Sequence, residues 1–144
     1  MATKVQIVLD CADPARLAEF WAAALGYHVQ PPPEGFPSWE AFLTEIGVPE
    51  SEWNSASAVV DPVGEGPRIF LQRVPEPRVT KNRMHLDLNV GGGHGTPDED
   101  RAARVDAEVT RLTGLGATDP SVMTQRGERW VVMHDPEGNE YCVQ

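Results

Sequence analysis

The feature of this sequence that most constrains its fold is a pattern that occurs twice. In each half, a strand-like segment leads into a capped amphipathic helix, and the half closes with a strand that follows an Asp-Pro turn. The closing strands also match, with GPRIFLQ at 66–72 and GNEYCVQ at 138–144. Solenoid repeats are shorter and more numerous than these halves. The sequence therefore predicts an α+β fold of two β-α-β-β-β modules, at about 4–74 and 83–144, joined by an extended linker at 75–82 within a single domain, 1–144.

The first module opens with the clearest local signals. Apolar and polar residues alternate over 5–10, which is typical of a strand buried on one face. Asp13 is a good N-cap and Pro14 a good first helical residue. The apolar stripe that follows consists of Leu17, Phe20, Trp21 and Ala24. We expect Gly26 to end this helix in a left-handed conformation.

The second module repeats these signals in weaker form. A strand is predicted within 84–90, and Thr96 and Pro97 are expected to cap and open a helix. The first turn of that helix is acidic, which suits the positive end of the helix dipole. Its apolar stripe consists of Ala102, Val105, Val109 and Leu112. Gly114 or Gly116 is expected to end it.

The first module contains an insertion at 31–56 that the second module lacks. Ser38 is predicted to cap a short helix within it. The apolar residues of this helix are Trp39, Phe42, Leu43 and Ile46. Two interpretations stay open: a lid or pocket wall beside a cleft, and a helix packed on the surface.

Charge and composition exclude several classes of protein. The chain has 144 residues with 22 acidic and 12 basic side chains, a formal net charge of −10, which argues against binding to nucleic acid or anionic membranes. No apolar run approaches the ~20 residues that span a bilayer, and the N-terminus lacks the features of a signal peptide. Cys11 and Cys142 are not spaced as a metal-binding pair, and we expect no disulfide between them. These features predict a cytoplasmic protein.

One segment carries a row of polar side chains. His85, Asp87 and Asn89 alternate with apolar residues, so a strand would place all three on one face. A histidine beside a carboxylate can act as a general base or as an ion-paired anchor for a ligand. The structural alternative is that His85 and Asp87 pair with Arg73, Lys81 or Arg83 and hold the two modules together.

Three segments give the sequence a resemblance to a known family. CADPARLAEFWAAALG at 11–26, KNRMHLDL at 81–88 and HDPEGNEYCV at 134–143 resemble the vicinal oxygen chelate superfamily, which includes glyoxalase I, bleomycin-resistance proteins and extradiol dioxygenases. The likeness is greatest to its small bacterial glyoxalase-like domain proteins. It implies that each module curls its sheet into a half-open trough, that two modules enclose a ligand cavity, and that the chain forms a homodimer.

The resemblance also implies positions for a metal site. Its metalloenzymes place ligands on the first and last strands of each module, and these positions fall here on Gln6, Phe70, His85 and Cys142. Both expected carboxylates are missing, since Phe70 cannot ligate an ion and Cys142 replaces a glutamate. Gln6, His85 and Cys142 remain as candidate ligands for Zn²⁺, Ni²⁺, Fe²⁺ or Mn²⁺, and Asp87 adds a carboxylate if its side chain converges with His85. An iron site of this type normally needs imidazole and carboxylate ligands.

Two functional hypotheses follow. The first is a protein that binds a small organic molecule in an aromatic-lined trough, without a complete catalytic metal site and with no cofactor expected. Its ligand-binding residues would be Gln6, Phe70, His85, Asp87, Trp130 and Cys142. The second is a metal-dependent lyase, isomerase or dioxygenase, in which His85 and Asp87 would be catalytic and His85 would bind the metal with Gln6 and a non-standard ligand. The missing carboxylates favour the first hypothesis.

Overall fold

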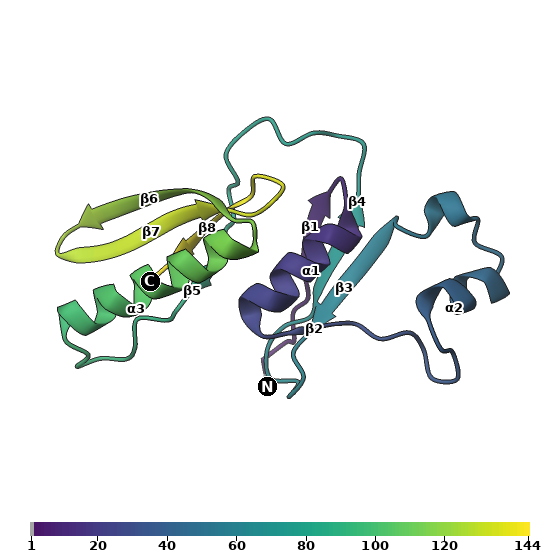
Figure 1. The fold of residues 1–144 in the computed structure, drawn as a ribbon, viewed down its shortest axis with the longest axis horizontal. Coiled ribbons are helices and arrows are strands. Elements are labelled where there is room, and N and C mark those ends of the chain that lie inside the picture. Colours follow the sequence, from purple (N-terminus) through teal and green to yellow (C-terminus); the bar gives the residue numbers. More distant parts are fainter. Residues whose placement is uncertain (1) are drawn as a thin grey trace. The chain divides into compact units, whose positions relative to one another are not determined.

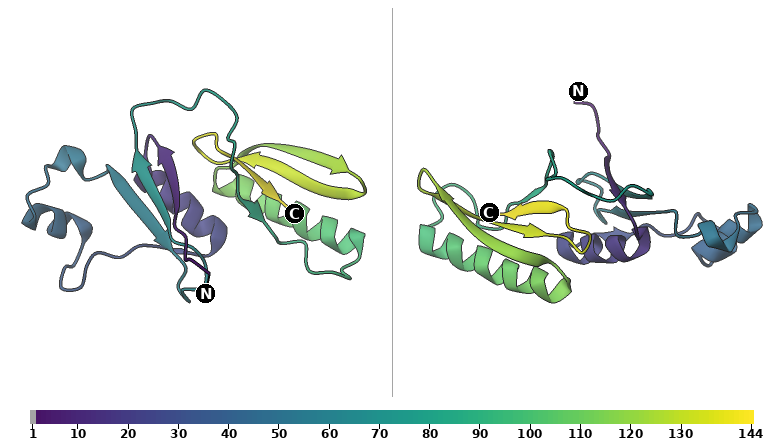
Figure 2. Two further views of the ribbon diagram at one scale, coloured as in Figure 1. Left: turned by 180° about the vertical axis from the view of Figure 1, so that it is seen from behind. Right: turned by 90° about the horizontal axis from the view of Figure 1, so that it is seen from above.

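The computed structural model describes residues 2–144, which form two compact units (Figure 1). Unit 1 ends at Pro77 and unit 2 begins at Arg78, inside the segment predicted as a linker. Within each unit, a long helix lies against one face of a four-stranded sheet (Figure 2). No helix in residues 2–144 combines the length and apolar character needed to cross a membrane.

Unit 1 contains a four-stranded sheet in the order β1-β4-β3-β2. Its elements are β1 (Ile7–Cys11), α1 (Pro14–Leu25), β2 (His28–Val29), α2 (Trp39–Glu45), a 3₁₀ turn (Glu50–Glu52), β3 (Ala56–Val60) and β4 (Ile69–Arg73). Strands β1 and β4 pair in parallel, whereas β3 pairs antiparallel with both β4 and β2.

Unit 2 has the same topology, with the strand order β5-β8-β7-β6. Its elements are β5 (Asp87–Leu88), α3 (Asp98–Leu115), β6 (Thr118–Gln125), β7 (Glu128–His134) and β8 (Glu140–Val143). Strands β5 and β8 pair in parallel, and the other neighbours are antiparallel. The predicted α+β fold of two β-α-β-β-β modules is confirmed. The sequence did not single out β6, whose residues are all exposed and carry no apolar alternation.

The registers of the two sheets correspond residue by residue. In unit 1, Val8 on β1 lies beside Phe70 on β4. In unit 2, Asp87 on β5 lies beside Cys142 on β8. Phe70 and Cys142 also correspond when the closing segments are aligned on Gly66 and Gly138, so Val8 and Asp87 occupy equivalent positions in the two units. One consequence is that Gln6, two residues before Val8, occupies the position of His85.

Helix α1 forms as its sequence predicts. The Asp13 side chain accepts a hydrogen bond from the Arg16 amide at 3.3 Å, and Gly26 ends the helix with a φ of +70°. The predicted stripe of Leu17, Phe20, Trp21 and Ala24 is buried. Burying each large side chain of this stripe stabilises the fold by about 1.5–3 kcal/mol. This face of α1 packs on the sheet of unit 1 (Figure 2).

Helix α3 differs from its prediction at its start, and it ends at one of the two glycines that were predicted to end it. It begins at Asp98, and its N-cap residue is Pro97. The prediction that Thr96 caps this helix is therefore wrong. Its C-cap is Gly116, with a φ of +112°, rather than Gly114. Val105 and Leu112 are buried, while the other two residues of the stripe are only half-buried. A polar helix of this kind is held to its sheet by few apolar contacts.

The insertion forms the predicted short helix. Ser38 accepts a hydrogen bond from the Ala41 amide at 3.2 Å, which confirms it as the N-cap of α2. The aromatic rings of Phe36, Trp39 and Phe42 pack edge to face on one another, with none of the residues of α2 fully buried. Helix α2 stands apart from α1 and from the sheet of its own unit (Figure 1). Its role as a lid or wall stays a prediction.

Each unit has an Asp-Pro turn before its closing strand. The Asp61 carboxylate accepts hydrogen bonds from three backbone amides of its turn, those of Val63, Glu65 and Gly66. Asp135 is 1% exposed, and it accepts from the amides of Glu137 and Asn139. These bonds satisfy the carboxylates locally, which makes both turns structural features.

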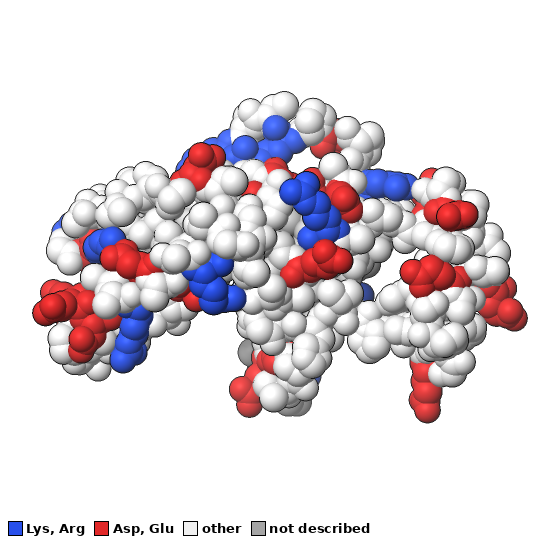
Figure 3. Space-filling view, viewed as in Figure 1, with Lys and Arg blue, Asp and Glu red and all other residues white. Residues whose placement is uncertain are grey.

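Charged side chains are scattered over the face of the molecule in Figure 3. Carboxylates are spread over α2 and the first turn of α3 (Figure 3), in keeping with the net charge of −10.

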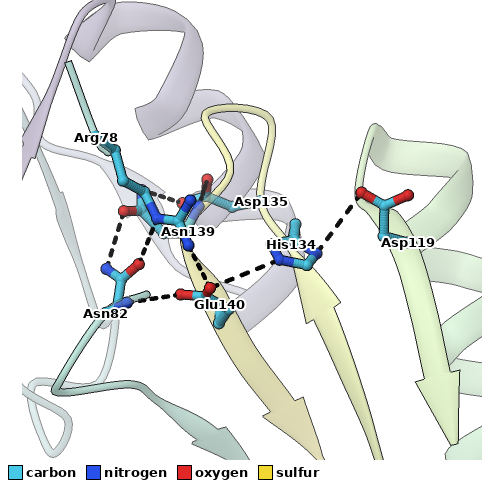
Figure 4. A network of polar contacts seen from close by, with 7 residues as sticks. All are labelled: Arg78, Asn82, Asp119, His134, Asp135, Asn139 and Glu140. Atoms are coloured by element: carbon cyan, nitrogen blue, oxygen red, sulfur yellow. Dashed lines mark hydrogen bonds and ion pairs between the residues drawn. The ribbon is translucent and has the colours of Figure 1, made fainter. Parts of the chain in front are cut away.

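The segment after Pro77 is fixed to unit 2 by a polar network (Figure 4). Arg78 forms an ion pair with Glu140 and donates to the Asn82 side chain at 2.8 Å. Glu140 also accepts from the backbone amide of Asn82 at 2.9 Å, and Asn82 donates to Asn139 at 3.1 Å. His134 Nε2 lies 3.8 Å from Glu140. This network anchors the predicted linker from Arg78 onward to the start of β8.

We predict that Glu140→Gln destabilises the protein at neutral pH. Burial alone would raise the pKa of Glu140, but the Asn82 amide and the charges of Arg78 and Lys81 outweigh it, so the pKa is lowered from 4.5. The stabilisation is therefore fully present above pH 4.5 and is lost as the pH falls through the lowered pKa. We expect a loss of about 1.5 kcal/mol in the free energy of unfolding at pH 7, shrinking in acid, by urea denaturation.

The control is Glu128→Gln, an exposed carboxylate at the start of β7. It should leave the free energy of unfolding unchanged across the same pH range. A Glu140→Gln deficit that stays constant down to pH 3 would show that the carboxylate charge contributes nothing.

Candidate functional site

The sheet of unit 2 has one face covered by α3 and one open face. Val131, Met133, Tyr141 and Val143 are buried on the α3 side. Because side chains alternate along a strand, the residues between them point to the open face. The register places Asp87, Cys142, Val132 and Ser121 in one row across that face. Trp130, paired with Met123, lies on the same face and is half-buried.

Three candidate residues come together on this face. His85 Nδ1 lies 2.9 Å from Asp87 Oδ1 and 3.9 Å from Cys142 Sγ. The possible ligand atoms of the three residues all lie within 4.8 Å of one another. The His85 and Asp87 side chains are 39% and 41% exposed, whereas Cys142 is 8% exposed. The cluster is thus a polar pair above a buried thiol.

The environment of Cys142 keeps its thiol protonated. Burial is the main cause that raises the pKa of Cys142, and the negative charge of Asp87 adds to it, against a smaller opposing effect of Lys81. A thiol must ionise to act as a nucleophile or as a strong metal ligand. The site therefore disfavours cysteine catalysis, and the His85–Asp87 pair is the better candidate for proton transfer or for anchoring a ligand.

The open face of unit 1 carries a different arrangement, centred on an arginine. Arg68 Nη1 donates to Gln6 Oε1 at 2.6 Å, and Arg68 Nε donates to Gln30 Oε1 at 2.7 Å. The Arg68 Cζ atom lies over the Phe70 ring, 5.2 Å from its centroid. This separation is within the range of a cation–π contact. Gln6 and Phe70, two of the predicted site residues, are thus joined through Arg68.

Arg68 and Gln30 were not among the predicted site residues. Arg68 precedes Phe70 by two positions, so the strand periodicity that grouped His85 with Asp87 could have included it. The sequence gives no comparable signal for Gln30, which accepts a hydrogen bond from Arg68 although the two residues are 38 positions apart.

The predicted site residues fall into two groups by unit. His85, Asp87, Trp130 and Cys142 belong to unit 2, and Gln6 and Phe70 belong to unit 1. The alternative prediction, that His85 and Asp87 pair with Arg73, Lys81 or Arg83, is wrong about the partners. The two residues pair with each other, and Arg73 pairs with Glu52 at 3.0 Å. Within residues 2–144, neither Lys81 nor Arg83 forms an ion pair with them.

The chemistry of the donors decides which metal ions each unit could hold. Imidazole, carboxylate and thiolate are all zinc ligands, so His85, Asp87 and Cys142 fit a zinc ion once the thiol ionises. They suit Mn²⁺ or Fe²⁺ poorly, because those ions favour oxygen and nitrogen donors over thiolate. In unit 1, the Gln6 oxygen already accepts from a guanidinium, and Phe70 has no donor atom.

We predict that Asp87→Asn accelerates alkylation of Cys142 by iodoacetamide at pH 8. The substitution removes a negative charge that raises the pKa of the thiol. We expect an increase of about threefold, because a partly exposed charge at this range contributes less than about 1 kcal/mol. Mass spectrometry of the C-terminal peptide measures the rate separately from that of Cys11.

Asp10→Asn, a carboxylate exposed on unit 1, is the matched control and should leave the rate at Cys142 unchanged. Equal or slower alkylation in Asp87→Asn would mean that the charge of Asp87 does not raise the pKa of the Cys142 thiol.

Comparison with solved structures identifies the fold. A mutant of the fosfomycin resistance protein FosX from Listeria monocytogenes, complexed with Mn(II) and 1S,2S-dihydroxypropylphosphonic acid, is 12% identical with a TM-score of 0.62, covering 100% of this chain and 90% of that one. A glyoxalase/bleomycin resistance protein/dioxygenase family enzyme from Burkholderia phytofirmans is 14% identical with a TM-score of 0.60, covering 96% and 94%. A possible glyoxalase from Bacillus cereus is 16% identical with a TM-score of 0.59, covering 100% and 99%.

Sequence comparison identifies the family. No curated protein matches the chain in sequence. The family model of the glyoxalase-like domain matches residues 6–144, which include every candidate site residue. The chain therefore belongs to the glyoxalase-like domain family of the vicinal oxygen chelate superfamily.

Proposed function

We propose that the protein binds a small organic molecule on the open faces of its sheets and works without a complete catalytic metal site. Ligand sites are usually apolar surfaces with a few convergent polar groups. Phe70 beside Arg68 in unit 1 and Trp130 with the His85–Asp87 pair in unit 2 have this composition. The proposal includes an aromatic-lined trough as the place where the molecule binds.

The observation that carries the proposal is the hydrogen bond between Arg68 and Gln6. Gln6 lies at the position of a metal ligand in the superfamily, and its oxygen accepts from a guanidinium at 2.6 Å. A fixed positive charge at this point repels a divalent cation. Since Phe70 cannot ligate, His85 and Cys142 are the remaining donors of the four superfamily positions, and the raised pKa of Cys142 opposes its ionisation.

We predict that the purified protein carries far less than one equivalent of any divalent metal. Elemental analysis measures the content, and calorimetric titration with Zn²⁺, Ni²⁺ and Fe²⁺ measures the affinity. We expect weak zinc binding at most, which His85→Ala abolishes and Gln6→Ala leaves unchanged, because Gln6 is engaged by Arg68. Stoichiometric metal that is lost in both variants would overturn the proposal and support a metalloenzyme.

We predict that a neutral aromatic probe, naphthalene-1-carboxamide, binds to the wild-type protein. Phe70→Ala or Trp130→Ala should each weaken binding, measured by titration of the probe's fluorescence. A lost aromatic contact is worth about 1 kcal/mol, or about a fivefold change in Kd. The control is Val63→Ala, an exposed apolar residue in the turn before β4. Unchanged binding in both aromatic variants would contradict a ligand site on these faces.

A metal-dependent lyase, isomerase or dioxygenase is the second candidate. The observation that favours it is the convergence of His85, Asp87 and Cys142 within 4.8 Å. The similar FosX protein from Listeria monocytogenes was complexed with Mn(II). In this chain the three residues would hold zinc, which would supply a Lewis acid. His85 would then be a ligand, and Asp87 would orient its ring or bind the ion itself.

We further propose that the two units form one domain and that the chain is a cytoplasmic homodimer. The similar solved chains are matched over 90–99% of their own length, which supports a single domain of this size. Sedimentation equilibrium of the full chain tests the dimer.

A further inference from the structure

We infer that Arg68 recognises the carboxylate of an aromatic acid on the open face of unit 1. This inference rests on the proposed function and specifies the chemical class of the ligand. It depends on three properties of Arg68: a fixed orientation, a positive charge that no carboxylate within residues 2–77 neutralises, and an apolar ring beside it.

Three separate segments fix the orientation of Arg68. Gln6 lies just before β1, Gln30 just after β2, and Arg68 itself just before β4. The backbone holds these segments in place, since the Ile7 amide donates to the Arg68 carbonyl at 3.0 Å and the Gln30 amide donates to the Ala58 carbonyl at 2.8 Å. A guanidinium that is already ordered loses little entropy when it binds a ligand.

The two glutamines leave most of the guanidinium available. Arginine has five N–H donors. Gln6 and Gln30 accept from one each, at Nη1 and Nε. Within residues 2–77, no other side chain accepts from the remaining three, and Arg68 is only half-buried. A carboxylate can therefore accept two parallel hydrogen bonds from the free N–H groups.

Within residues 2–77, no carboxylate forms an ion pair with Arg68. Both of its side-chain partners are neutral amides, whereas Arg73 pairs with Glu52 at 3.0 Å and Arg129 with Asp106 at 2.7 Å. An arginine held by amides keeps its full charge for an anion from outside.

The surface beside Arg68 favours an aromatic ligand. The Phe70 ring lies under the guanidinium, with Ala58 opposite it on β3 and Val8 opposite it on β1. Val8 is 50% exposed although it is apolar. A flat ring attached to the carboxylate can cover the Phe70 and Val8 side chains while the carboxylate reaches Arg68.

The experiment compares 1-naphthoate with naphthalene-1-carboxamide, its neutral analogue, in fluorescence titrations of the full chain. We expect the wild-type protein to bind the carboxylate more tightly than the amide. Arg68→Gln should weaken naphthoate binding by about tenfold or more, the value of a charged hydrogen bond. It should leave binding of the carboxamide within about twofold.

A second variant keeps Arg68 in place and removes only its free charge. In Gln6→Glu, the new carboxylate forms an ion pair with Arg68, so naphthoate should again lose about tenfold in affinity. Arg73→Gln is the matched control, because it removes an equal charge from the far end of β4, the strand that Arg68 precedes, at an arginine that is already paired. It should leave both probes unaffected. Circular dichroism verifies the folding of each variant.

The outcomes separate this inference from the proposed function. If both probes bind and neither Arg68→Gln nor Gln6→Glu changes their ratio, Arg68 is not the anion site, although the proposed function stands. If the carboxamide binds and the carboxylate does not, the ligand class is wrong. If neither probe binds, the inference is overturned, and the aromatic site of the proposed function is overturned with it.

Discussion

The parallel pairing of the first and last strands is the constraint on which the rest of each unit depends. These strands are distant in sequence, and their backbone hydrogen bonds set which side chains lie side by side on the open face. The pairing places Val8 beside Phe70 in unit 1 and Asp87 beside Cys142 in unit 2. A shift of one residue would turn every one of these side chains toward the helix. The buried apolar residues on the helix side, such as Ile69 and Val143, therefore hold the site in register.

The same backbone positions carry opposite chemistry in the two units. Arg68 and Glu140 each lie two residues before the paired residue of the closing strand, at Phe70 and Cys142. Arg68 is fixed by neutral amides, whereas Glu140 is held by Arg78 and by the amide of Asn82. Glu140 has a structural role, because its negative charge already forms an ion pair with Arg78. Arg68 differs from Glu140 in this respect, because its two side-chain partners within unit 1 are neutral.

Local signals predicted the elements that depend on local chemistry. The caps at Asp13 and Ser38 and the stripe of α1 involve neighbours within one or two turns, so the sequence alone was sufficient. The polar network of Arg78 with Glu140 and the contact of Arg68 with Gln6 each join residues 62 positions apart. Such contacts depend on strand register, which sequence periodicity does not supply for polar residues. Strand β6 was missed for a related reason: its exposed residues have no apolar alternation, and pairing with β7 alone makes it a strand.

The distance between an anion and Arg68 decides whether the net charge of the protein or the charge of Arg68 has the larger effect on binding. The net charge of −10 repels an approaching anion, but salt screens charges beyond about 8 Å at physiological ionic strength. A carboxylate bound to Arg68 would lie about 3 Å from the guanidinium, well inside that distance. The local attraction therefore prevails for a ligand that reaches the site. A divalent cation experiences the reverse: the acidic surface attracts it, whereas Arg68 repels it from Gln6. Under the proposed function, a cation would therefore bind to His85, Asp87 and Cys142 rather than to Gln6, and burial of the thiol would limit its affinity.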